Sequence, residues 1–375
     1  MTKIDFIYFD AGGGHRAAAL ALQSLIQQQN RPWQIRLVNL QEILGPLDVF
    51  RKITGIALED IYNHMLAKGW TLGSAQGLRL MQAVIHLYHS PTVQLLTKHW
   101  TQAQPDMVVS LVPNFNRALR ESLKAVCPQV PYVTILTDFA DYPPHFWMER
   151  QEQHLICGTG KAVTQARSLG YPADRVFETS GMILRPKFYD PITVDRGAER
   201  RRLGLDPERL TGLVLFGGQG SKVMLEIARR AAETQLIFIC GKNEDLARRL
   251  RAAAATAPRF VEGFTSEIPY YMHLADFFIG KPGPGSISEA VTMRLPVIVE
   301  RNAWTLPQER YNADWILEQK VGLVLPNFRG IQGAIAQMER GMAEFRASVE
   351  RIHNRAVFEI PAILSKILES SSGSS

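Results

Sequence analysis

The sequence predicts an α/β protein made of two doubly wound domains, each with a parallel sheet. Strand-like apolar runs alternate with amphipathic segments through both halves of the chain, which is the pattern of repeated βα units. Glycine-rich loops follow several of these runs, as they do where such sheets bind ligands. The length of 375 residues also favours two domains, because one domain commonly holds about 100–200 residues.

The apolar runs are expected to form the strands of the two sheets. Those of the first half are Ile4–Phe9, Ile35–Leu40, Met107–Val112, Val133–Leu136 and His154–Cys157. Those of the second half are Leu213–Phe216, Leu236–Cys240, Phe277–Ile279, Pro296–Val299 and Leu323–Leu325. Amphipathic segments between them, such as Ala17–Gln28 and Glu244–Ala255, predict the helices.

Composition shifts along the chain predict where the domains begin and end. A proline-rich, charged stretch separates the two sets of apolar runs, and a long polar and apolar stretch interrupts the first set. We expect a first domain at 1–183 with a helical insert at 43–104, a linker at 184–209, and a second domain at 210–330. Residues 331–375 are expected to form a helix that returns toward the first domain, followed by a disordered tail.

Composition and charge narrow the class of protein. Hydrophobic residues make up 46% of the chain and charged residues 21%, which excludes general disorder. There is no apolar run of membrane-spanning length, and Met1 leads directly into a strand, so we expect a cytoplasmic protein without a signal peptide. The net charge of +6 is spread over both halves. The run Arg200–Arg202 is interpreted as a solvated helix face, so no nucleic-acid partner is expected.

The first glycine-rich loop, FDAGGGHRAAALAL, joins the first expected strand to a helix. Its glycines allow close approach of a ligand, and the helix N-terminus favours anions. The G-x-G-x-x-A dinucleotide pattern also fits, but Asn39 stands where a dehydrogenase carries its acidic ribose ligand. His15 is placed to act as a base near pH 7, or else it caps or packs the helix.

Two further glycine-rich loops lie in the second half. LFGGQGSKVML has glycines in a βα turn but not the spacing of a Walker A loop. In GKPGPGSISEA, the backbone amides of residues 285–287 are candidates to hold a diphosphate without a metal, and Glu289 is a candidate for ribose hydroxyls. The alternative is a plain helix start with Ser286 as N-cap.

A fourth segment, TLPQERYNADW, follows the expected strand Pro296–Val299. Pro307 suits the start of a helix, which puts Gln308, Glu309 and Asn312 on its first turns. These side chains either bind sugar hydroxyls or form a solvated helix face. Together with the glycine-rich loops, this segment predicts a nucleotide-bearing donor substrate.

The ordered set of these motifs resembles a known family. FDAGGGHRAAALAL, LFGGQGSKVML, LIFICGKNEDLARRL, FVEGFTSEIPYYM, GKPGPGSISEA, LPVIVE and PQERYNADWILEQKVGLVL are similar to segments of the diacylglycerol glycosyltransferases, above all the monogalactosyldiacylglycerol synthases. These enzymes are related to the lipid-linked N-acetylglucosaminyltransferase of peptidoglycan synthesis. The resemblance implies a GT-B fold of two Rossmann-like domains that face a cleft. It also implies inverting transfer from a UDP-sugar, with neither metal nor cofactor.

The resemblance also implies roles for individual residues, carried over by matching position. His15 and Asp138 are the expected catalytic residues, and the acceptor side is expected to include Gly13, Gly14, His145 and Trp147. The expected donor-binding residues are Gly217, Gly218, Gly220, Phe264, Thr265, Gly285, Ser286, Glu289, Gln308 and Glu309. Among them, Phe264 and Thr265 are expected beside uracil, and Gln308 and Glu309 beside the hexose.

From this resemblance we expect a hexosyltransferase that moves galactose or glucose from a UDP-sugar to diacylglycerol or a similar membrane lipid. The insert, with its aromatic and apolar residues, would dock on an anionic membrane surface, so the expected location is the inner face of the cell membrane. Three alternatives stay open. They are a glycosyltransferase with a polyprenyl-linked or soluble acceptor, a UDP-GlcNAc 2-epimerase, and a non-catalytic nucleotide-sugar-binding protein.

Overall fold

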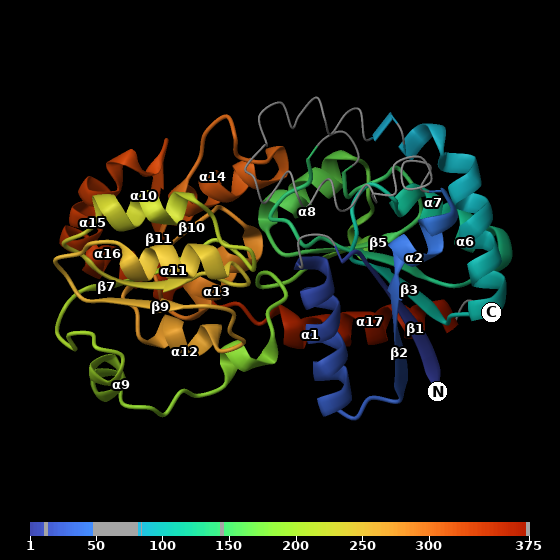
Figure 1. Ribbon diagram of the computed structural model, residues 1–375. Coiled ribbons are helices and arrows are strands. Elements are labelled where there is room, and N and C mark those ends of the chain that lie inside the picture. Colours follow the sequence, from blue (N-terminus) through green and yellow to red (C-terminus); the bar gives the residue numbers. More distant parts are fainter. Residues whose placement is uncertain (11–13, 48–81, 84, 143–145, 373–375) are drawn as a thin grey trace. The chain divides into compact units, whose positions relative to one another are not determined.

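A computed structural model describes residues 1–10, 14–47, 82–83, 85–142 and 146–372. The chain divides into two compact units, each with its own sheet (Figure 1). Within the described residues, the first unit comprises the chain up to Pro186 and the segment from Asn354 onward, and the second comprises Lys187–His353. Most of the predicted insert at 43–104 lies outside the described residues.

The first unit is a parallel sheet with strand order β2-β1-β3-β4-β5-β6 among the described residues. Its strands are β1 Thr2–Tyr8, β2 Trp33–Asn39, β3 Met107–Ser110, β4 Tyr132–Ile135, β5 His154–Cys157 and β6 Val176–Glu178. Its helices are α1 Gly14–Gln28, α2 Leu40–Leu44, α6 His89–Ala103, α7 Asn116–Val126, α8 Gly160–Ser168 and α17 Ala356–Ser372, with short 3₁₀ turns η1 Gly45–Leu47 and η2 Ala173–Arg175. A third 3₁₀ turn, η3 Pro186–Tyr189, begins at the last residue of this stretch and continues into the second unit.

The second unit is also a parallel sheet, with strand order β12-β11-β10-β7-β8-β9. Its strands are β7 Thr211–Leu215, β8 Gln235–Ile239, β9 Arg259–Glu262, β10 Phe277–Gly280, β11 Val297–Glu300 and β12 Gly322–Leu325. Its helices are α9 Arg196–Arg202, α10 Val223–Arg230, α11 Glu244–Ala252, α12 Ile268–His273, α13 Pro284–Thr292, α14 Arg310–Gln319, α15 Ile331–Arg340 and α16 Met342–Glu350, with η4 Pro307–Glu309 and η5 Phe328–Gly330.

Each sheet is covered by helices whose apolar faces supply its core. In the first unit, Trp100 of α6 and Leu119 of α7 pack with Ile7 and Val108 of the sheet. The Trp100 indole donates a 2.9 Å hydrogen bond to Ser122 Oγ, which links the two helices. In the second unit, α10, α11 and α15 pack on one face of the sheet. The doubly wound α/β architecture predicted from the alternating runs is therefore confirmed.

All of the predicted runs overlap strands, but β6 and β9 were missed. Both lie at the edge of a sheet. Val261 is their one buried residue, and charged residues such as Arg259 and Glu262 occur in them. Neither therefore forms the apolar run by which a buried strand is recognised.

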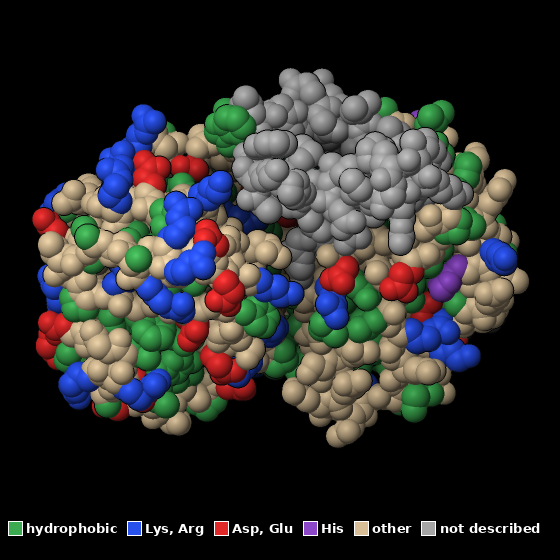
Figure 2. All heavy atoms as spheres, in the orientation of Figure 1, with side chains coloured by type: hydrophobic (Ala, Val, Ile, Leu, Met, Phe, Trp, Pro, Cys, Tyr) green, Lys and Arg blue, Asp and Glu red, His purple; other side chains and the backbone are tan. Residues whose placement is uncertain are grey.

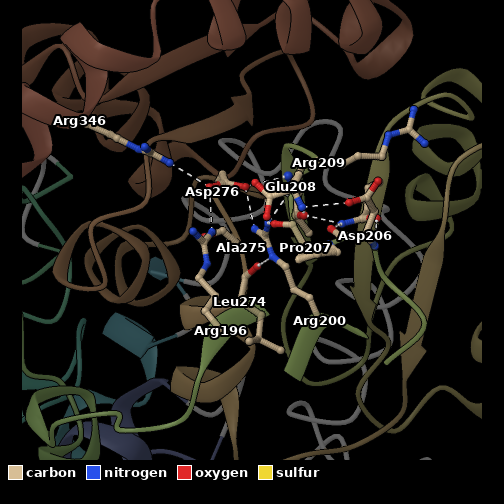
Figure 3. A network of polar contacts seen from close by, with 12 residues as sticks. Arg196, Arg200, Asp206, Pro207, Glu208, Arg209, Leu274, Ala275, Asp276 and Arg346 are labelled. Carbon is tan, nitrogen blue, oxygen red and sulfur yellow. Dashed lines mark hydrogen bonds and ion pairs between the residues drawn. The ribbon is translucent and has the colours of Figure 1, made fainter. Parts of the chain in front are cut away.

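The predicted linker region is anchored to the second sheet by a buried carboxylate, Asp276, which precedes β10 (Figure 3). Its oxygens accept hydrogen bonds from Arg200 at 2.7 Å, Arg196 at 2.8 Å, Arg346 at 2.9 Å and the Thr211 amide at 2.9 Å. Burial raises the pKa of Asp276, but the bonds and charges of Arg196 and Arg200 outweigh it and hold that pKa below its ordinary value.

This network corrects the interpretation of Arg200–Arg202 as a solvated helix face for Arg200 alone, since Arg201 and Arg202 are exposed as expected. Arg200 is only 3% exposed, and it also donates to the backbone carbonyls of Leu274 and Pro207. The arginine-rich sequence is typical of a surface helix, so its buried partner Asp276, which is distant in the sequence, could not be recognised from it. Over the described residues in Figure 2, Lys and Arg side chains lie interspersed with Asp and Glu rather than gathered in one patch.

The C-terminal region forms three successive helices instead of the single helix expected within 331–375. The last, α17, packs with α1 within the first unit. Arg31, just after α1, donates to Ser365 Oγ at 2.8 Å and to the Pro361 carbonyl. At the start of α17, the Ser180 hydroxyl donates to Glu359. Among the helices described, none combines the length and hydropathy that crossing a membrane requires.

Candidate functional site

In the first unit, the order of strands changes direction between β1 and β3. The chain passes from β1 to β2 on one side and then to β3 on the other. Ligands of doubly wound sheets bind at the carboxyl ends of the strands where this reversal occurs. The loop that carries GGGH follows β1, so it lies at this point. Gly13 lies outside the described residues, and Gly14 begins α1.

His15 is half-buried in the first turn of α1. Its Nδ1 lies 3.1 Å from the hydroxyl of Thr137, which follows β4. Burial lowers the pKa of His15 to about 4, and a backbone hydrogen bond with Leu111, after β3, opposes this. The imidazole is therefore neutral at pH 7, which is the protonation state that a general base requires.

Trp147 joins the two predicted catalytic residues. Its ring centroid lies 5.8 Å from that of His15, and its indole N–H donates to Asp138 Oδ2 at 2.8 Å. The Trp147 side chain is fully buried and Asp138 is 8% exposed. The backbone amide of Trp147 donates to Asp141 Oδ1, which fixes the loop after β4. His15, Asp138 and Trp147 thus come together as the sequence predicted, while His145 lies outside the described residues.

In the second unit, the strand order reverses between β7 and β10, and two of the predicted glycine-rich loops follow these two strands. After β7, Gly217 and Gly220 have φ of +75° and +60°, a region that favours glycine. The loop rests on the turn after β8, where a Cβ on Gly241 would lie 2.2 Å from the Gly218 carbonyl oxygen. Gly218 itself is exposed.

The loop after β10 leads into α13, whose N-cap is Gly283 and whose first residue is Pro284. The amides of Gly285 and Ser286 lie in the first turn and have no intrahelical acceptor, whereas Ile287 N–H donates to the Gly283 carbonyl. The Ile287 amide already has an acceptor, so only the amides of Gly285 and Ser286 remain as candidates to bind a diphosphate. Ser286 makes no N-cap bond, so the alternative of a plain capping serine is wrong. Glu289 lies half-buried one turn further along α13.

Three predicted loops contain a glycine that packing among the described residues does not require. A Cβ placed on Gly14, Gly218 or Gly285 would meet no described atom within 4 Å. Glycine is expected at such places where backbone must come close to a ligand. The open space at these positions would admit a ligand, and its binding there stays a prediction.

Phe264 and Thr265 follow β9. The Phe264 ring is 65% exposed, and Lys242 Nζ lies 5.7 Å from its centroid. The Thr265 hydroxyl accepts from Glu267 N–H at 3.0 Å, so it stabilises a local turn. An exposed aromatic face beside the glycine loop is suited to stacking on a flat base.

The burial of side chains in the fourth segment, TLPQERYNADW, rules out one of the two interpretations offered for it. Gln308 and Glu309 lie in η4, and Glu309 is only 8% exposed, while Asn312 in α14 is fully buried. Asn312 Nδ2 donates to the Pro282 carbonyl at 2.8 Å, and Lys281 Nζ lies 3.1 Å from Glu309 Oε1. A solvated helix face is thus excluded for Glu309 and Asn312. These contacts join the segment to the loop after β10.

Sequence reasoning missed Thr137, Lys242 and Lys281. Lys242 and Lys281 lie within segments that were singled out, and Thr137 directly precedes Asp138. Strand order decides what they contact: Thr137 meets His15 because β4 lies two strands from β1. Lysine and threonine are common on surfaces, so neither carried a signal of its own.

Similarity to known proteins agrees with this arrangement. Residues 213–327 match the glycosyltransferase family 28 C-terminal domain. The chain is 25% identical over 335 residues to the probable monogalactosyldiacylglycerol synthase 2 of Oryza sativa subsp. japonica, a match that covers 84% of the chain and 68% of that protein. Acinetobacter baumannii MurG has a similar structure, with a TM-score of 0.62, 13% identity, and coverage of 98% of this chain and 100% of MurG. The chain is a GT-B glycosyltransferase.

The predicted resemblance to the monogalactosyldiacylglycerol synthases and the predicted GT-B fold are thereby confirmed. The fold of the glycosyltransferase is also similar to that of Anabaena HepE solved in complex with UDP, with a TM-score of 0.53, 14% identity, and coverage of 99% of this chain and all of HepE. The part of the enzyme that matches the family 28 domain contains β7 through β12, hence both glycine-rich loops of the second unit.

Proposed function

We propose that the enzyme is a UDP-sugar-dependent, inverting hexosyltransferase that transfers galactose or glucose to diacylglycerol or a similar membrane lipid. The observation that carries this proposal is that each unit has a switch point, the place in its sheet where the strand order reverses. One bears a neutral, half-buried histidine, and the other bears exposed glycine backbone and an open helix start. The names of the sequence relatives, monogalactosyldiacylglycerol synthases, support the lipid acceptor.

The second unit would hold the donor. Uracil would stack on Phe264 beside Thr265, and Glu289 would accept hydrogen bonds from the ribose hydroxyls. The diphosphate would bind the amides of Gly285 and Ser286 and lie against the loop Gly217–Gly220, and the hexose hydroxyls would meet Gln308 and Glu309. The complex of HepE with UDP supports a uridine nucleotide as the ligand of this fold.

The first unit would supply the acceptor side and the base. The neutral His15 would take the proton of the acceptor hydroxyl as that oxygen forms a bond to C1 of the hexose. The bond from C1 to the β-phosphate oxygen breaks, and its electron pair leaves with UDP on the face opposite the attacking oxygen, so the configuration at C1 is inverted. Asp138, Trp147 and Gly14 would orient the acceptor and the imidazole, together with Gly13 and His145.

The experiment measures UDP release by the purified enzyme with UDP-galactose, UDP-glucose or UDP-GlcNAc, each with and without diacylglycerol in anionic vesicles. We expect release that depends on both the lipid and one hexose donor. Release on polyprenyl phosphate or on a soluble alcohol instead would overturn the lipid acceptor while retaining the donor site. Conversion of UDP-GlcNAc without any acceptor would indicate an epimerase.

Two further controls complete this test. Because helix-start amides are proposed to neutralise the diphosphate, release should persist in excess EDTA, and its loss would contradict transfer without a metal. Cosedimentation with anionic and neutral vesicles tests peripheral attachment to the inner face of the cell membrane. We expect binding that is stronger on anionic vesicles and weakened by salt.

A further inference from the structure

An ion pair joins the predicted donor-binding residue Glu309 to Lys281, a residue that the prediction did not include. Lys281 comes directly after β10, and Glu309 ends the 3₁₀ turn after β11. Lys281 Nζ is 3.1 Å from Glu309 Oε1, and the exposed fractions of the two side chains are 44% and 10%. The pair thus combines a nearly buried carboxylate with an ammonium that solvent and solutes can reach.

The pair adjoins the start of α13. A Cβ built on Gly283, the N-cap of that helix, would lie 3.3 Å from Lys281 Cε and 3.7 Å from Glu309 Oε1. The ammonium therefore lies beside the turn that leads to the open amides of Gly285 and Ser286. A lysine ammonium at the edge of a helix start adds a full positive charge where the helix dipole supplies a partial one.

A second observation at this turn concerns Asn312. Its side chain is fully buried, and its Nδ2 holds the Pro282 carbonyl at 2.8 Å. Its Oδ1 is buried without a hydrogen-bond partner among the described residues. A buried acceptor left unpaired carries a free-energy cost, and it is typical of a site that a ligand or water completes. The turn from Lys281 to Gly283 is thus fixed by a buried hydrogen bond, while a buried acceptor beside it has no partner among the described residues.

We propose that Lys281 binds the donor diphosphate and exchanges partners as it does so. Without donor its ammonium pairs with Glu309. With donor bound it moves to the diphosphate, and the freed Glu309 carboxylate accepts hydrogen bonds from the hexose hydroxyls. This inference rests on the proposed function, and it adds a residue that neither the glycine motifs nor the helix start identified.

The exchange follows from the charges. Glu309 is nearly buried, so it needs a partner at every stage: the ammonium before binding and sugar hydroxyls afterwards. The diphosphate carries more charge than one carboxylate, and the flexible stem of lysine allows its ammonium to follow the larger charge. During transfer, the electron pair of the broken C1–oxygen bond goes to the β-phosphate, and the acceptor proton goes to the base. Lys281 would stabilise the phosphate charge that grows at this step.

Isothermal titration of the full chain with UDP and with uridine tests the proposal, using Lys281→Met, Lys281→Arg and Glu309→Gln. We expect Lys281→Met to weaken UDP binding about 10-fold or more and uridine binding less than about 2-fold, since a charge-assisted bond to phosphate is lost and the base site is kept. The salt dependence of UDP binding should also fall. Lys281→Arg, which keeps the charge, should retain most of the affinity.

Glu309→Gln tests separately the two parts of the proposed exchange, which are the transfer of Lys281 to the diphosphate and the binding of the hexose by Glu309. Removing the carboxylate takes away the partner that competes with the diphosphate for the ammonium, so UDP affinity should be unchanged or higher. Turnover of the UDP-hexose should fall because the sugar loses its acceptor group. Lys320→Met, which removes an exposed lysine of the same unit, is the matched control and should change neither. Melting temperatures of all variants report whether each is folded.

Equal loss of UDP and uridine affinity in Lys281→Met, or no loss of either, would overturn the inference. If Glu309→Gln weakened UDP as much as Lys281→Met, the carboxylate would be a fixed support for the lysine and the exchange would be wrong. If the unmodified enzyme bound no UDP, the proposed function would fall first. Binding of UDP by the unmodified enzyme with an unaffected Lys281→Met rejects only the role of Lys281.

Discussion

The two switch points of this enzyme differ in how far their side chains are exposed to solvent. At the first, His15, Asp138 and Trp147 are bound to neighbours by short hydrogen bonds and ring contacts, and Asp138 is 8% exposed. At the second, the Phe264 ring is 65% exposed and the start of α13 is open. Two sheets with similar strand arrangements thus present chemically different edges.

The difference matches what each chemistry requires. Proton transfer needs a base in a defined protonation state, and burial holds His15, the proposed base, in the neutral form. Binding of a diphosphate needs accessible N–H groups and positive charge, so amides and lysines must remain reachable. In this enzyme the edge with largely buried side chains, the desolvated edge, and the edge with exposed side chains and amides, the hydrated edge, therefore belong to different sheets.

The largest expected effect comes from removing the proposed base. His15→Ala should lower kcat by about 100- to 10,000-fold, the usual contribution of a general base, with UDP affinity changed less than about 2-fold. Glu289→Ala should instead weaken UDP binding about 10-fold through a lost charge-assisted bond to ribose. Steady-state kinetics and UDP titration measure both.

His353→Ala is the control for this pair, because His353 is an exposed histidine outside both edges. It should leave kcat and UDP affinity unchanged. Equal loss of UDP affinity in His15→Ala and Glu289→Ala would contradict the division between the two edges. Unchanged kcat in His15→Ala would remove the histidine from the reaction.

A second pair of substitutions compares two glycines of the hydrated edge. Gly241→Ala should destabilise the enzyme by about 1–3 kcal/mol, because φ is +59° and the new methyl group would meet the Gly218 carbonyl. Gly285→Ala meets no described atom and lies in the first turn of α13, so the melting temperature should hold. UDP affinity should fall in Gly285→Ala if the diphosphate approaches there. Thermal melts and UDP titration distinguish the two, and an unaffected affinity in Gly285→Ala would contradict this position of the ligand.

These residues also indicate what the sequence could reveal. The loops around Gly217 and Gly285 were recognisable because glycine and proline at βα turns have a local physical meaning. The buried strands were recognisable from their continuous apolar runs, as in β8. Edge strands such as β6 carry no such run, and they were missed.

The remaining features depend on contacts between distant parts of the chain. Arg200 has the local sequence of a surface helix, and only the position of Asp276 across the unit shows why it is buried. Thr137 and Lys281 acquire their places from the order of strands, which no local pattern encodes. Residue type and spacing therefore predict which loops matter, and topology decides which side chains meet there.

A smaller effect is expected from Trp147→Phe at the desolvated edge. The substitution keeps an aromatic ring beside His15 but removes the N–H that satisfies the nearly buried Asp138 oxygen. We expect a loss of about 1–3 kcal/mol in the free energy of unfolding, together with lower kcat and unchanged UDP affinity. Denaturant titration and kinetics measure these quantities. A loss of UDP affinity as large as that of kcat would contradict the assignment of Trp147 to the acceptor side.

The smallest effect distinguishes burial from catalysis. His154, at the start of β5, also has its pKa lowered to about 4, by burial first and then by the charge of Arg175. Between pH 6.5 and 4 the unfolded chain binds the proton that the folded chain excludes, so this histidine lowers stability as the pH falls, by at most about 1.4 kcal/mol per pH unit. His154→Gln should make that acid destabilisation shallower and leave kcat at pH 7.5 unchanged. Denaturant titrations between pH 7.5 and 4.5 measure the acid destabilisation, and steady-state kinetics measure kcat. A fall in kcat as large as that of His15→Ala would contradict the view that position at the switch point, rather than a lowered pKa, distinguishes His15.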